Sequence, residues 1–128
     1  MNANLLTPNK DPMGYAIADF YAKGKAGKLR VFSSQFDEDE IPVDQLFRTF
    51  DEMPVLEQKA LELAQGKILD CGAGSGCHAL ALQDMGKDVE AIDISPRSVE
   101  VMQKRGIQHA YCVNLFDDFL FNMHNGFP

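Results

Sequence analysis

A glycine-rich segment near the middle of the chain, DCGAGSG at residues 70–76, constrains the fold more than any other feature. The letters KILDC at 67–71 predict a short strand, and the apolar spacing over 75–85 predicts a helix. Gly72 and Gly74 carry no Cβ, so the backbone there can approach a ligand closely. Because ligands of open α/β sheets bind outside the carboxyl ends of the strands, the segment predicts a ligand-binding turn.

The residues after Gly66 alternate between strand and helix signals. A second helix is predicted to begin at the Ser95 cap and to end at Gly106. Such alternation is typical of a parallel sheet with crossover helices. We therefore expect an α/β fold whose partial parallel sheet has about four strands. After the strand at 67–71, the further strands are predicted at residues 88–92, 110–113 and 119–123.

The first 66 residues are predicted to be mainly helical and irregular, and to form one domain with the rest of the chain. Helices are expected at residues 14–23, 43–50 and 54–65, with Gly66 just past the end of the last one. The last of these carries an apolar stripe that is expected to face the core, formed by Leu56, Ala60, Leu61 and Ala64. We expect residues 1–66 to form a helical cover over residues 67–128.

An acidic residue follows the glycine segment at the spacing of a nucleoside-binding site. Asp93 ends the second predicted strand about 20 residues after Gly72, where a carboxylate accepts hydrogen bonds from a ribose diol. Dinucleotide-binding loops read G-x-G-x-x-G and face a pyrophosphate. Here Cys77 stands in the place of that third glycine, and Asp70 would repel a pyrophosphate. A nicotinamide-dependent oxidoreductase is therefore the less favoured alternative.

These residues resemble the class I S-adenosylmethionine-dependent methyltransferases. The glycine motif of that family, an acid and any residue before G-x-G-x-G, matches residues 70–76. Its second-strand acid matches Asp93, and its third-strand motif, Asp or Asn before an apolar residue, matches Asn114 and Leu115. The resemblance covers about residues 67–123. It implies a Rossmann-like sheet that binds S-adenosylmethionine and releases S-adenosylhomocysteine.

The resemblance also implies a role for each matching residue. Asp70 is expected near the methionine part of the ligand, directly or by orienting the loop, while the loop glycines pass beneath the ligand. Asp93 is expected to hold the ribose hydroxyls, and Ile94 to pack on the adenine. Asn114 is expected to bond to the adenine edge, with the amide of Leu115 as a second donor.

The methyl acceptor is much less constrained than the donor. A sulfonium is an already activated leaving group, so the protein mainly aligns the acceptor with the methyl group. We expect a small-molecule acceptor and assign no catalytic residue. Weaker candidates for acceptor binding are Tyr15, Tyr21, Arg30 and His124.

The family's full sheet has strands beyond the fourth, and these 128 residues have no material for them. We therefore expect a truncated form that binds the cofactor without full activity. A catalytically silent cofactor-binding or assembly module is the alternative outside the enzymes. A fourth strand left as a sheet edge also predicts a homodimer or larger homo-oligomer through that edge.

Composition limits the kinds of binding partner and the cellular compartment that are expected for this chain. The net charge of −7 argues against a nucleic-acid-binding surface, which is normally basic. No stretch is apolar enough to span a bilayer, and the first residues lack the pattern of a signal peptide, so a cytoplasmic protein is expected. Cys71, Cys77 and Cys112 lack the paired spacing of a zinc site. They are expected to be buried free thiols without a metal.

Overall fold

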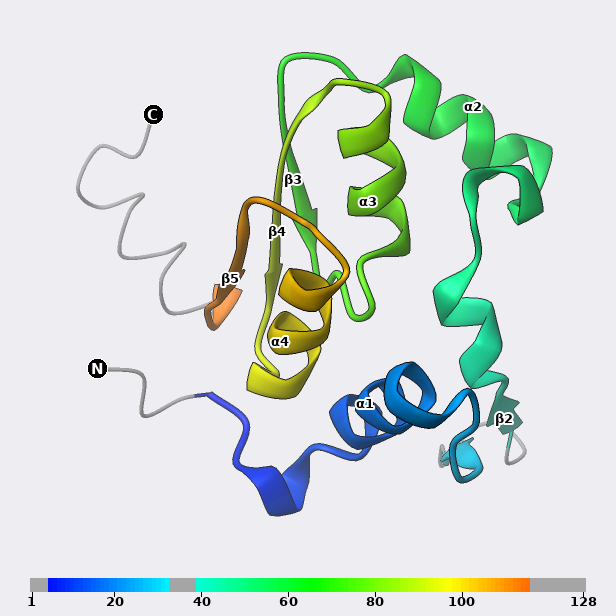
Figure 1. The fold of residues 1–128 in the computed structure, drawn as a ribbon, viewed down its shortest axis with the longest axis vertical. Helices are drawn as coiled ribbons and strands as arrows, with labels where there is room; N and C mark the ends of the chain where they lie inside the picture. Colours follow the sequence, from blue (N-terminus) through cyan, green and yellow to red (C-terminus); the bar gives the residue numbers. More distant parts are fainter. Residues whose placement is uncertain (1–4, 33–38, 116–128) are drawn as a thin grey trace.

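The computed structural model describes residues 5–32 and 39–115, and its centre is a three-stranded parallel sheet (Figure 1). The strands are β3 (Lys67–Cys71), β4 (Asp88–Asp93) and β5 (Ala110–Cys112), in the order β3-β4-β5. The predicted α/β fold with a partial parallel sheet is thus confirmed. The strand predicted at 119–123, and the sheet edge expected there, lie outside the described residues.

Helices α3 (Cys77–Asp84) and α4 (Pro96–Lys104) lie on one face of this sheet (Figure 1). The Ser95 side chain caps α4 as predicted, because its Oγ accepts a hydrogen bond from the Ser98 amide at 3.2 Å. The main core forms where these helices meet the sheet, and it is built from Ala79, Leu82, Val89, Ala91, Val99, Met102, Ile107 and Ala110.

The part of the chain before the sheet is less helical than the sequence predicts. Its elements are η1 (Pro8–Lys10), α1 (Pro12–Lys23), β1 (Leu29–Val31), β2 (Asp39–Ile41), η2 (Val43–Phe47), η3 (Phe50–Glu52) and α2 (Val55–Leu63). Strands β1 and β2 form a small antiparallel hairpin that the sequence analysis missed. Strands of three residues are too short for an alternating pattern to reveal them.

The helix predicted at 43–50 is wrong, because two short 3₁₀ helices occupy this region. Arg48 and Thr49 between them have extended backbones. The Thr49 amide donates a hydrogen bond at 2.9 Å to the carboxylate of Glu52, which starts a new turn with a capping box.

The apolar stripe of α2 is only half buried, which corrects a second prediction. Leu61 and Ala64 pack against the core, whereas Leu56 is 82% exposed and Ala60 is also exposed. Polar contacts decide how the helix is turned. The Gln58 side-chain amide donates hydrogen bonds to the carbonyls of Phe50 and Met53, at 3.1 and 3.0 Å, and so faces the protein.

Helix α1 packs beside α4, near the end of the sheet at which the strands finish (Figure 1). The Tyr21 hydroxyl on α1 donates a hydrogen bond at 3.3 Å to the Lys104 carbonyl at the end of α4. The cover also contacts the first turn of α4, beside the end of β4, where the Asp11 carboxylate accepts a hydrogen bond from the Ser95 hydroxyl. Within residues 5–32 and 39–115, no helix has the length and apolar character needed to cross a membrane.

Candidate functional site

The glycine segment forms the turn between β3 and α3. Gly72, Gly74 and Gly76 all have positive φ angles, of 63°, 60° and 81°, which side-chain-bearing residues rarely adopt. The Ala73 amide donates a hydrogen bond at 3.0 Å to the carbonyl of Ile92 on the neighbouring strand. The loop is therefore fixed against the end of β4.

Asp93, the last residue of β4, is held from two sides by backbone amides. The Gly74 amide donates to its Oδ2 at 2.8 Å, and the Ser95 amide donates to its Oδ1 at 2.9 Å. Each carboxylate oxygen accepts more than one hydrogen bond, so both can still accept from a ligand. The side chain is thus oriented at the crevice before any ligand is bound.

Two neighbouring cavities share Gly72, Asp93 and Ile94 and together form one crevice along the strand ends. The smaller, of about 240 Å³, is closed by Asn114 and Leu115, which the sequence analysis predicted at this site. The larger, of about 420 Å³, extends along the glycine loop and beneath the N-terminal cover.

The cover closes the larger cavity through the residues just before α1 and through the middle of that helix. The Asp11 carboxylate is 2% exposed and accepts a hydrogen bond from the Ser95 hydroxyl, while the Leu6 amide donates to the Ile94 carbonyl at 3.3 Å. The fully buried Ile17 side chain faces the backbone of Gly74. Asp11 also lines this cavity, and it could not be selected from sequence spacing because its partner Ser95 lies far along the chain.

Asp70 lies behind the loop rather than among the residues that line the two cavities. Burial raises the pKa of its carboxyl, although nearby His78 and a hydrogen bond from the Ala79 amide oppose the shift. Its Oδ2 is buried and has no hydrogen-bond partner in the described part of the chain. In this position Asp70 anchors the start of α3 beneath the loop.

Three weaker candidates from the cover lie away from the crevice. Tyr15 is 44% exposed beneath the guanidinium of Arg97, at 3.7 Å from the ring centroid, and Tyr21 bonds to the end of α4. Arg30 lies exposed on β1. None of the three lines either cavity. His124 lies outside the described residues.

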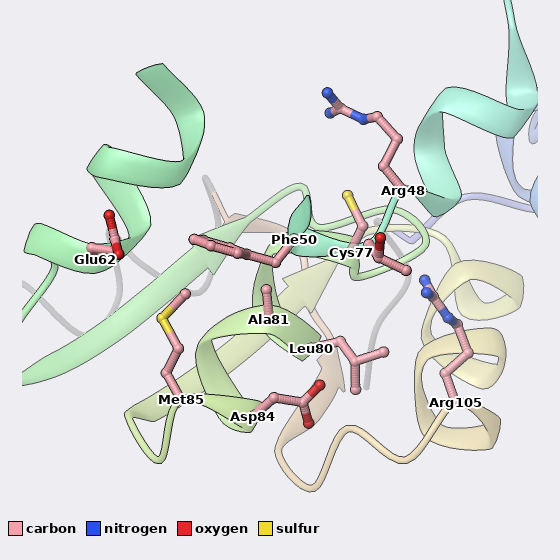
Figure 2. Close-up of a pocket in the computed structure, with 10 residues that line it drawn as sticks. Arg48, Phe50, Glu62, Cys77, Leu80, Ala81, Asp84, Met85 and Arg105 are labelled. Carbon is pink, nitrogen blue, oxygen red and sulfur yellow. The ribbon is translucent and has the colours of Figure 1, made fainter. Parts of the chain in front are cut away.

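A separate cavity of about 370 Å³ lies between the cover and the outer side of α3 (Figure 2). Arg48 and Arg105 lie toward one end and Met85 and Glu62 toward the other (Figure 2). Burial lowers the pKa of Arg105, which donates a hydrogen bond to the carbonyl of Ser75 at 2.7 Å. This arginine therefore supports the loop from behind.

Comparison with known proteins agrees with this geometry. Residues 69–122 match the family model of a methyltransferase domain. A solved S-adenosylmethionine-dependent methyltransferase from Bacteroides fragilis, in complex with S-adenosyl-L-homocysteine, is 69% identical with a TM-score of 0.84. The match covers 92% of this chain and 49% of that one. The chain belongs to the S-adenosylmethionine-dependent methyltransferase family.

Two further solved structures are more distant from this methyltransferase chain. A structure described under the conversion of a disulfide bond into a thioacetal group during echinomycin biosynthesis is 30% identical, with a TM-score of 0.43, over 48% of this chain and 28% of that one. The plantazolicin methyltransferase, in complex with S-adenosylhomocysteine, is 14% identical, with a TM-score of 0.41. That match covers 85% of this chain and 42% of the plantazolicin methyltransferase. No curated protein matches the chain significantly.

The cysteines of the methyltransferase chain differ in their surroundings. Cys77 is buried, and burial raises the pKa of its thiol, whereas Cys71 is exposed, contrary to the prediction. Cys71 ends β3 on the sheet face opposite the helices that form the core. Among the described residues, no three His, Cys, Asp or Glu side chains gather as a metal site requires.

A charged cluster that sequence reasoning missed also lies at this crevice. Arg48 and His78 both line the larger cavity, and both contact the carboxylate of Glu57 on α2. No spacing pattern in the sequence links Arg48, Glu57 and His78, because the three residues come from separate parts of the fold.

Proposed function

We propose that the chain binds S-adenosylmethionine, and S-adenosylhomocysteine as the product, along the joined crevice. The orientation of Asp93 is the observation that carries this proposal. Asp93 lines both cavities, and each of its oxygens, already held by one backbone amide, can accept a further hydrogen bond, which suits the two hydroxyls of a ribose. The nucleoside base then extends into the smaller cavity, and the amino acid end extends into the larger one.

The residues present fit this ligand. Ile94 offers an apolar surface for the adenine, and Asn114 and the Leu115 amide offer polar groups for its edge in the smaller cavity. In the larger cavity the Ser98 hydroxyl is 1% exposed and has no hydrogen-bond partner in the described part of the chain. A buried polar atom without a partner is costly, and a ligand that binds it removes this cost.

The position of Asp70 argues against a dinucleotide. It places a carboxyl group behind the glycine loop, and the ionised form of this group disfavours a pyrophosphate on the other side of the loop. A sulfonium or ammonium group of the methyl donor instead stabilises the charged form of Asp70. We therefore favour the methyl donor over a nicotinamide cofactor.

The bound donor supplies an activated methyl group, and the chain's own task is to position it. We propose a small-molecule acceptor that approaches from the side of the cover, where the larger cavity continues past Leu46 and Met13. The chain spans about half the length of the Bacteroides fragilis structure, so transfer to an acceptor is proposed separately from donor binding.

Calorimetric titration with S-adenosylhomocysteine, and with a nicotinamide dinucleotide for comparison, tests the proposal. Saturable binding of the first ligand alone is expected. Asp93→Ala is expected to weaken this binding by roughly tenfold or more, because two charge-assisted hydrogen bonds are lost. The matched control is Asp88→Ala, which removes an exposed carboxylate at the start of the same strand.

Equal binding by wild type and Asp93→Ala would contradict the proposed site. A radiolabelled methyl-transfer screen on the chain then separates an enzyme from a silent module. Transfer to a small molecule supports the methyltransferase proposal, and binding without transfer supports the silent module.

A further inference from the structure

The cavity of about 370 Å³ on the outer side of α3, called the outer cavity below, is distinct from the crevice at the strand ends (Figure 2). Among the described residues, the only ones that it shares with the larger cavity of the crevice are Arg48 and Cys77, and it shares none with the smaller one. The loop glycines at 72, 74 and 76 do not line it. A molecule bound there lies behind the glycine loop and outside the proposed donor site.

Arg105, at one end of the outer cavity, is a partly buried cation without a carboxylate partner. Its Nη1 donates a hydrogen bond to the Ser75 carbonyl at 2.7 Å, and its guanidinium carbon lies 4.9 Å from the centre of the Phe47 ring. Burial lowers the pKa of Arg105, and within residues 5–32 and 39–115 no Asp or Glu forms an ion pair with it. A guanidinium has five N–H donors, so Arg105 has donors left for an anion that would supply the missing counter-charge.

The remaining charges divide the outer cavity into a positive end and a negative surround. Arg48 adds a second guanidinium at the Arg105 end (Figure 2), although Glu57 offsets its charge at 3.1 Å from Nη2. The acidic residues that line the cavity, Glu62 and Asp84, are both exposed. Water screens exposed charges more than partly buried ones. One anionic group is therefore favoured beside the arginines, and a second one near the exposed acids is disfavoured.

The rest of the lining is mainly apolar. It includes the side chains of Phe50, Leu80, Ala81 and Met85 (Figure 2). The ring of Phe50 and the thioether of Met85 both suit contact with an aromatic ring. An apolar cavity of roughly 150 Å³ is enough to hold benzene. The outer cavity, at about 370 Å³, has room for two fused rings and a carboxylate.

We propose that the outer cavity is a binding site for an organic monoanion with an aromatic body. The carboxylate of the ligand pairs with Arg105, with Arg48 beside it, and its rings pack against the apolar lining. A guanidinium suits a carboxylate because it can donate two parallel hydrogen bonds. The site lies outside the crevice, so its ligand is neither the methyl donor nor the methyl acceptor, and the inference does not rest on the proposed function.

Calorimetric titration of the 128-residue chain with 2-naphthoate, its neutral amide and the dianion 2,6-naphthalenedicarboxylate tests the proposal. The monoanion is expected to bind roughly tenfold more tightly than the amide, because hydrogen bonds to a charged group are stronger. It is also expected to bind about threefold more tightly than the dianion, whose second carboxylate meets the exposed acids. Arg105→Gln is expected to abolish the preference for 2-naphthoate over the amide. Lys104→Gln, which removes the neighbouring exposed cation, is the matched control and is expected to keep it.

Backbone amide NMR shifts locate the site without any variant, and they decide the question if Arg105→Gln fails to fold. Titration with 2-naphthoate is expected to shift the signals of Ala81 and Met85 on α3 and to leave those of Gly72 and Leu115 at the crevice unchanged. Shifts confined to the crevice would overturn the inference, and so would the absence of binding at millimolar concentrations.

The charge comparisons can overturn the inference as well. An amide that binds as tightly as 2-naphthoate would show that the arginines do not recognise an anion. A folded Arg105→Gln variant that keeps the wild-type preference would show the same for Arg105. A dianion that binds as tightly as the monoanion would overturn the assigned ligand class. Failure of S-adenosylhomocysteine to bind is a separate result, which contradicts the proposed function and leaves this inference standing.

Discussion

Gly76 leaves the space that Met102 fills. A Cβ built on Gly76 would lie 2.8 Å from Cγ of Met102, closer than two carbon atoms pack, and would also meet the side chain of Ile107. Gly76 has a φ of +81° as well. The last glycine of the loop therefore lets α4, and the turn after it, pack against the start of α3. Its role is in the core and not at the ligand.

Gly76→Ala is accordingly expected to destabilise the fold by about 3 kcal/mol, the sum of backbone strain and overpacking. Gly86→Ala is the matched control, because Gly86 has the same φ of +81° and open space around it. The control is expected to lose only about 1 kcal/mol of unfolding free energy, because it suffers the strain of a positive φ but no overpacking. Urea unfolding of both variants gives the comparison, and equal losses would show that Met102 and Ile107 yield to the added methyl.

The part of the site that could be predicted from the sequence is the part built by neighbouring residues. The strand, turn and helix around Gly72 follow each other directly, so spacing alone located them. Asp93 was located because a strand, a helix and a second strand need a nearly constant length of chain. The structure then places its carboxylate beside the amide of Gly74.

The cover could not be predicted in the same way. Its contacts with the crevice join residues far apart in the chain, such as Asp11 and Ser95, which are 84 positions apart. Polar contacts rather than apolar burial set the orientation of α2, so the stripe containing Leu56 misled the prediction. Hydrophobic periodicity carries no information about such contacts.

Asp11 is expected to couple the cover to the crevice at the end of β4. Its carboxylate accepts from the Gly14 amide at 3.0 Å and from the Ser95 hydroxyl, and it is 2% exposed. Asp11→Ala is expected to cost about 2–3 kcal/mol of unfolding free energy, whereas Asp19→Ala on the same helix costs little. A double-mutant cycle with Ser95→Ala measures the interaction energy between the Asp11 and Ser95 side chains. Additive losses of unfolding free energy would mean that the two side chains do not interact.

Lys87 is expected to hold the end of α2 against the sheet. Its Nζ donates to the carbonyls of Leu61, Glu62 and Ala64, at 2.8, 2.6 and 2.7 Å, at the C-terminal end of the helix. A cation satisfies these carbonyls and interacts favourably with the helix dipole. Lys87→Met is expected to cost about 1–2 kcal/mol in urea unfolding, together with some helical circular dichroism.

Lys104→Met provides the control for Lys87. It removes a lysine whose partner is Glu100, an exposed residue one turn earlier on α4, at 2.9 Å. Such exposed surface pairs contribute little to stability. Similar losses in the two variants would contradict the anchoring role of Lys87.

Asp70 is expected to make stability depend on pH in the opposite sense to a paired carboxylate. Burial raises its pKa above the ordinary value of 3.8, so in the window just above 3.8 the folded state binds more protons than the unfolded state. Its contribution to stability therefore falls as pH rises through that window. Asp70→Asn removes the titration, so the variant is expected to gain stability relative to wild type as pH rises from acidic to neutral. Urea unfolding of both chains across this range measures the difference, and a difference that is independent of pH would mean that the charge of Asp70 is already compensated behind the loop.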